Sequence, residues 1–66
     1  MKLTKMDMAK VIVTALYNFS TVEEAVTFPI VANHAKKLAR AKKEDIIPQY
    51  ELAKRILEDR IKKEGG

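Results

Sequence analysis

The 66-residue sequence contains no cysteine and no tryptophan, one histidine, and two glycines that both stand at its C-terminal end. The absence of cysteine excludes disulfides and thiolate metal sites, and one histidine is too few for a conventional zinc site. A glycine-rich phosphate loop is excluded too, because no glycine precedes the last two positions. We therefore expect neither a bound metal nor a cofactor.

Side chains suited to catalysis are equally few. Ser20 is the only serine and is explained as a helix cap, while nucleophilic catalysis needs an activating base beside the nucleophile. The single histidine, His34, falls on the flank of an amphipathic helix. Glu23 and Glu24 are adjacent, and neighbouring helical residues point about 100° apart. We expect that the protein is not an enzyme.

Long apolar runs are missing as well. No segment approaches the roughly 18 apolar residues that cross a bilayer, and the N-terminal residues lack the apolar core of a signal peptide. These absences predict a cytoplasmic protein with no membrane span. A chain of 66 residues forms one small domain, and such a domain buries only about 60% of its unfolded surface. Close packing or self-association must therefore supply its stability.

The spacing of apolar residues predicts an all-α fold, a single compact domain over residues 1–66. We expect helices at about 4–18, 22–42 and 46–63, with a frayed tail at 64–66. The positions predicted to face the core are Met8, Val11, Ile12, Ala15, Leu16, Phe19, Phe28, Val31, Ala32, Ala35, Leu38, Ala39, Ile46, Ile47, Tyr50, Ala53, Ile56, Leu57 and Ile61. This pattern predicts three helices in contact.

Local signals define the ends of the first helix. Thr4 and Asp7 have capping-box spacing, with aspartate in place of glutamate. Asn18 suits the left-handed residue after the helix, and either Ser20 or Thr21 then fits as the cap of the next helix. Val13 and Tyr17 widen the apolar face of the first helix, so they indicate either cover on two sides or contact with a partner.

Two prolines affect the later helices. Pro29 either kinks one helix over 22–42 or breaks it, and a break gives four helices in total. We favour the break, with Thr27 capping a new helix that has Pro29 in its first turn. Asp45 is the expected cap of the last helix, with Pro48 in its first turn.

The net charge of +4 comes from one window. Residues 1–32 are balanced and residues 44–66 carry −1, whereas residues 33–43 hold five cations and no acid. At about 100° per residue, Lys36, Arg40 and Lys43 lie within roughly 60° of each other on the second helix. Lys37 and Asn33 extend this face, and Lys42 projects elsewhere. The sequence therefore predicts one cationic face on this helix, opposite its apolar face.

This small basic protein is therefore expected to bind nucleic acid phosphates, and a helix-turn-helix-like arrangement is one scaffold for such binding. The candidate nucleic-acid contacts are Asn33, His34, Lys36, Lys37, Arg40 and Lys43. A different hypothesis is a protein-interaction adaptor that docks an acidic partner or forms a homodimer. Its candidate interface residues are Val13, Tyr17 and Ile30. A merely solvated helix face is the third interpretation.

Overall fold

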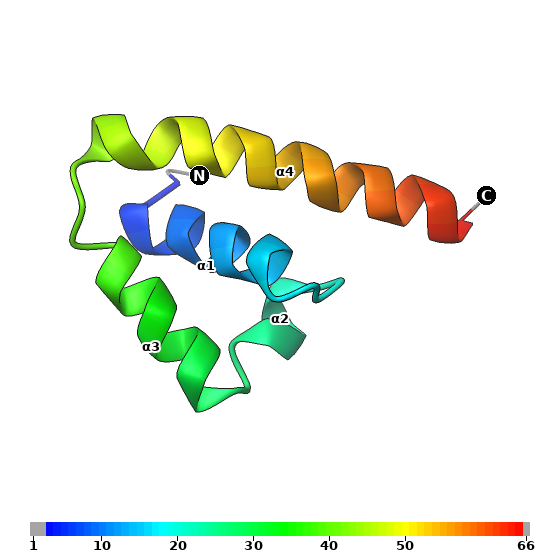
Figure 1. The fold of residues 1–66 in the computed structure, drawn as a ribbon, viewed down its shortest axis with the longest axis horizontal. Coiled ribbons are helices and arrows are strands. Elements are labelled where there is room, and N and C mark those ends of the chain that lie inside the picture. The colour runs from blue at the N-terminus through cyan, green and yellow to red at the C-terminus, as the bar shows by residue number, and fades with distance from the viewer. Residues whose placement is uncertain (1–2, 66) are drawn as a thin grey trace.

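Four α-helices make up the fold in the computed structural model, which describes the backbone of residues 3–65 and the side chains of residues 3–63. They are α1 (Lys5–Leu16), α2 (Val22–Ala25), α3 (Pro29–Leu38) and α4 (Lys43–Gly65) (Figure 1). Residues 3–65 contain no strand, so the all-α prediction is confirmed. Helix α1 lies in the middle and packs against the other three. None of the helices within this range is long and apolar enough to cross a bilayer.

The start of α1 is fixed by the predicted capping box. The Thr4 hydroxyl accepts from the Asp7 backbone N–H at 3.1 Å, and the Asp7 carboxylate accepts from the Thr4 N–H at 3.2 Å. These two bonds satisfy donors that a helix N-terminus otherwise leaves free. The bond from the Thr4 N–H, together with the nearby Thr4 hydroxyl, favours the ionised carboxylate and holds the pKa of Asp7 below its usual value of 3.8.

The end of α1 is a Schellman turn centred on Asn18. This residue has φ 61°, in the left-handed region that asparagine tolerates better than most residues. Its N–H bonds to the Ala15 carbonyl at 3.2 Å, and the Phe19 N–H bonds to the Thr14 carbonyl at 2.9 Å. Asn18 therefore ends the helix as its sequence position predicts.

Pro29 breaks the predicted second helix into α2 and α3, which gives the four-helix form. Thr21 caps α2 by accepting from the Glu24 N–H. Thr27 is not the cap of α3, because its hydroxyl donates backward to the Glu24 carbonyl at 2.6 Å. Phe28 is the N-cap and makes no side-chain capping bond, while Pro29 occupies the first turn. The fixed φ of proline starts α3 without a polar cap.

The connection from α3 to α4 differs from the prediction. Helix α3 ends at Leu38, well before residue 42, and α4 begins at Lys43. Asp45 consequently lies inside the first turn of α4 rather than capping it, and Pro48 lies within the helix. At the other end α4 continues to Gly65, beyond the predicted helix end at residue 63, and residue 66 of the predicted tail lies outside the described residues.

The core consists of two clusters on opposite sides of α1. The first faces α4 and contains Met8, Ile12, Ala15, Ile46 and Ala53. The second faces α2 and α3 and contains Ala9, Val13, Ala25, Val31 and Ala35. Helix α1 is thus covered on two sides. Several large residues predicted to be buried are instead exposed: Leu16, Phe28, Ile47, Ile56 and Ile61. These small clusters leave much apolar surface in solvent.

Candidate nucleic-acid interface

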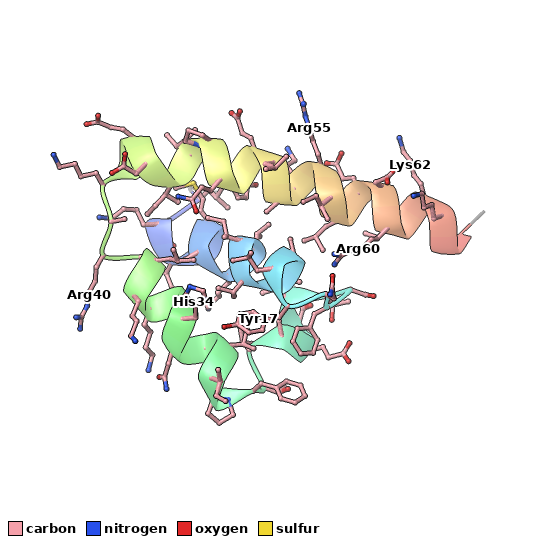
Figure 2. The ribbon with its side chains drawn as sticks, viewed as in Figure 1. Tyr17, His34, Arg40, Arg55, Arg60 and Lys62 are labelled. Carbon is pink, nitrogen blue, oxygen red and sulfur yellow. The ribbon has the colours of Figure 1, made fainter. Side chains whose placement is uncertain are left out.

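The five cations of residues 33–43 gather at one end of the molecule, on three consecutive segments. Lys36 and Lys37 lie in the last turn of α3, Arg40 and Lys42 in the connection, and Lys43 at the start of α4. We call these five residues the basic corner. All five are exposed. Figure 2 shows Arg40 projecting from the connection away from the helices.

The basic corner is not the single helix face that the sequence predicts. The chain leaves the helix after Leu38 in a series of turns, with the Arg40 N–H bonding to the Lys37 carbonyl at 3.2 Å. The angular argument that placed Lys36, Arg40 and Lys43 on one face is therefore wrong. These cations instead lie around the bend between α3 and α4.

A further cation, Lys5 of α1, lies beside this bend. Its Nζ donates to the Ala41 carbonyl at 3.2 Å, 36 positions away in the sequence. The contact fixes the connection to the start of α1 and adds positive charge next to the basic corner. Sequence analysis missed Lys5 because no local pattern links it to residues 39–42.

Acidic neighbours do not pair with the basic corner. Glu44 and Asp45 follow it in the first turn of α4, where carboxylates favour the helix N-terminus. Within residues 3–63 there is one ion pair, which joins Lys63 Nζ to the Asp59 carboxylate at 3.5 Å, at the far end of α4. Among the side chains that the structure describes, none forms an ion pair with the basic corner, and its cations are exposed.

The two polar candidates on α3 have different surroundings. Asn33 is exposed, and at about 100° per residue it falls between Lys36 and Lys37 around the helix. His34 is half-buried, and its Nδ1 lies 3.1 Å from the Tyr17 hydroxyl. Their rings meet edge to face at 5.8 Å (Figure 2). Asn33 therefore shares the cationic side of α3, whereas His34 joins α3 to the end of α1.

The three predicted partner-interface residues also differ in their surroundings, because one is buried and two are exposed. Val13 is fully buried in the core and cannot touch a partner, which corrects that prediction. Tyr17 and Ile30 are 41% and 75% exposed. They line a shallow hollow of about 290 Å³ together with Phe19, Phe28, Pro29 and Val31.

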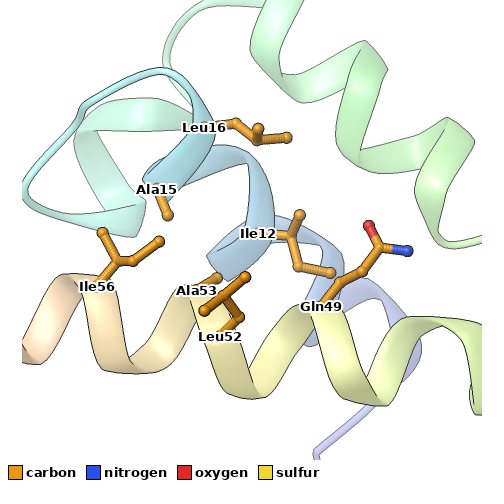
Figure 3. A pocket seen from close by; sticks show the side chains of 7 residues that line it. All are labelled: Ile12, Ala15, Leu16, Gln49, Leu52, Ala53 and Ile56. Atoms are coloured by element: carbon orange, nitrogen blue, oxygen red, sulfur yellow. The ribbon is translucent and has the colours of Figure 1, made fainter.

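A second hollow, between α1 and α4, was not predicted. It has a volume of about 300 Å³ and is lined by Ile12, Ala15, Leu16, Gln49, Leu52, Ala53 and Ile56 (Figure 3). Leu16 and Leu52 are each 61% exposed. Leu52 is a large apolar residue outside the apolar stripe predicted for the last helix. An apolar residue in that position is the sequence feature that could have indicated this groove.

Comparison with protein-family models, curated proteins and solved structures finds no match to this chain. Within residues 3–63, no three side chains of the metal-binding types come together. The distinctive surface features are the basic corner and the two apolar hollows.

Proposed function

We propose that the protein binds nucleic acid phosphates through the basic corner and acts by binding rather than by catalysis. The observation that supports this most strongly is the cluster of five exposed cations around the α3–α4 bend, none of them ion-paired within residues 3–63. Lys5 lies beside them. Clustered lysine and arginine side chains gain affinity for nucleic acid by releasing counterions from the phosphates.

The position of these cations along the chain favours contact with the phosphate backbone over contact with base edges. In helix-turn-helix proteins the N-terminal residues of the recognition helix contact bases. Here the α3 cations, Lys36 and Lys37, lie in its last turn, and α2 has only four residues. Asn33 is the side chain on this surface that suits adenine. We therefore expect weak sequence preference, with phosphate contacts predominating.

Double-stranded nucleic acid is the preferred ligand of this surface. Proteins that bind single strands stack bases on aromatic side chains within a cationic groove. The basic corner contains no aromatic residue, and Tyr17 is engaged with His34. An acidic protein that uses the same cations is the second candidate, and the assay below separates the two.

The test is a gel shift at low salt with a short labelled DNA duplex and two matched triple variants. One variant reverses Lys36→Glu, Lys37→Glu and Arg40→Glu in the basic corner. The control reverses Lys54→Glu, Arg55→Glu and Lys62→Glu on exposed positions of α4. Both change the formal net charge from +4 to −2, because each loses three positive charges and gains three negative ones.

Phosphate binding by the basic corner predicts that the corner variant loses the shift while the control retains most of it. Equal loss in both variants would show that only net charge matters. Absence of a shift with the unmodified protein would contradict the proposal and favour an acidic protein partner.

A further inference from the structure

The molecule exposes more surface than a compact monomer of its mass. A 7.5 kDa chain is expected to expose about 4,200 Å², whereas this one exposes 5005 Å². The excess, about 800 Å², is what one partner buries in a standard protein interface. Helix α4, with 23 residues, extends past the end of α1 (Figure 1).

An exposed apolar strip lies beside the α1–α4 groove. Leu52 is 61% exposed and Ile56 is 37% exposed. Leu16 of α1 lines the same groove and is 61% exposed (Figure 3). These side chains lie outside the core clusters of their own chain. Large apolar side chains gathered in an exposed groove are typical of a contact surface.

Along α4, polar and charged residues extend this apolar strip toward both ends of the helix. Side chains on a helix step about 100° per residue, so six positions fall within an arc of about 80°. In chain order they are Asp45, Gln49, Leu52, Ile56, Asp59 and Lys63. We call these six residues the α4 strip. All six are exposed, and none of them belongs to the basic corner.

We propose that the α4 strip binds a second copy of this chain, with the two α4 helices antiparallel. A two-fold axis midway between Leu52 and Ile56 places Leu52 of each copy opposite Ile56 of the other copy. The same axis places Asp45 opposite Lys63, and Gln49 opposite Asp59. Apolar side chains meet at the centre, and opposite charges meet at both ends. The strip is thus complementary to itself, as a two-fold interface requires.

Charge also selects the direction of the pairing. Parallel α4 helices in register would place Asp45 opposite Asp45, and Lys63 opposite Lys63. Like charges in close apposition oppose association. The antiparallel arrangement converts the same residues into two attractive pairs, and the exposed Leu16 of each copy lies beside the apolar centre.

The dimer would also separate the two basic corners by a useful distance. Lys43 and Gly65 bound α4, so antiparallel pairing places the corners about 33 Å apart along the helices, at 1.5 Å per residue. This is close to the 34–36 Å or so between DNA half-sites one turn apart. That correspondence rests on the proposed function, whereas the dimer itself does not.

The test is sedimentation equilibrium of the full chain and of charge variants, without nucleic acid. The unmodified protein is expected to reach twice its 7.5 kDa mass as its concentration rises. Asp45→Lys and Lys63→Asp should each weaken the dimer about 10- to 30-fold at low salt, because each turns two attractive pairs into two repulsive ones. Lys62→Asp, on another side of α4, is the matched control and should have little effect.

A mixture of the two variants tests the pairing itself. The Asp45→Lys chain carries lysine at both ends of the strip, and the Lys63→Asp chain carries aspartate at both. They should therefore form a heterodimer more readily than either forms a homodimer. Failure of the mixture to associate would overturn the antiparallel arrangement.

A single-chain mass for the unmodified protein up to about 1 mM would overturn the dimer altogether and leave the groove for a partner of another sequence. The exposed Leu52 provides a second variant, since Leu52→Asn should abolish the dimer while leaving the helical circular-dichroism signal unchanged. A dimer that persists in this variant would also contradict the proposal.

Discussion

The guanidinium of Arg60 donates a 2.8 Å hydrogen bond from Nη2 to the side-chain Oδ1 of Asn18. It also donates to the carbonyls of Ala15, at 3.3 Å, and Phe19, at 3.2 Å. The last turn of α1 contains no basic residue of its own. Arg60 of α4 therefore supplies the positive charge that stabilises a helix C-terminus, from 41 to 45 positions away (Figure 2).

Removing this contact should destabilise the fold. We expect Arg60→Ala to lower the free energy of unfolding by about 1.5–3 kcal/mol, because hydrogen bonds to charged groups are lost between α4 and α1. Arg60→Lys should restore little of it, since an ammonium cannot reproduce the planar fork. Urea denaturation followed by circular dichroism measures the change.

Arg55→Ala is the control, because Arg55 of α4 is exposed and points away from the other helices (Figure 2). Its effect should stay within about 0.5 kcal/mol. Combining Arg60→Ala with Asn18→Gly tests the pair directly. Glycine keeps the left-handed turn and removes only the side chain, so the two effects should be less than additive. Strict additivity would show that Asn18 and Arg60 do not interact.

The Thr4–Asp7 capping box predicts a pH dependence at the start of α1. The pKa of Asp7 is lowered in the folded chain by the Thr4 hydrogen bonds. Its contribution is therefore fully present above the unfolded value of 3.8 and is lost as the pH falls through the lower, folded value. Asp7→Asn should lower Tm at neutral pH, and the difference from the unmodified protein should shrink in strong acid. A constant difference across this range would contradict the assignment.

The two prolines should respond in opposite ways to alanine substitution. Pro48 lies inside α4 and has no N–H to donate to the preceding turn. Pro48→Ala should stabilise by about 2 kcal/mol, from a helix-propensity gain of about 3 offset by the added freedom of the unfolded chain. Pro29 begins α3, where proline is favourable, so Pro29→Ala should destabilise by up to about 1 kcal/mol. Urea denaturation of both variants tests the pair, and changes of the same sign would be inconsistent with these positions.

Features of the fold that depend on neighbouring residues are predictable from the sequence. The Thr4–Asp7 box, the left-handed Asn18 and the break at Pro29 each follow from the residue type and its immediate neighbours. The end of α3 at Leu38 does not, because Ala39, Arg40 and Ala41 all favour a helix. The chain turns there without glycine, and this turn lets α4 fold back and bury Ile46 against α1.

The candidate site was predictable in composition but not in shape. The clustering of positive charge in residues 33–43 is evident in the sequence. Whether those cations share a helix face depends on where α3 ends, which long-range packing decides. For the same reason periodicity could not distinguish the buried Val13 from the exposed Leu16, since both lie on the broad apolar face of α1.

The measurement that tests nucleic-acid binding most directly is the affinity for a DNA duplex as a function of salt. If the five cations of the basic corner each neutralise one phosphate, the logarithm of the association constant should fall with the logarithm of salt concentration with a slope of about −4 to −5. The corner variant should not bind measurably. A slope near zero, or no binding at the lowest salt, would contradict the account.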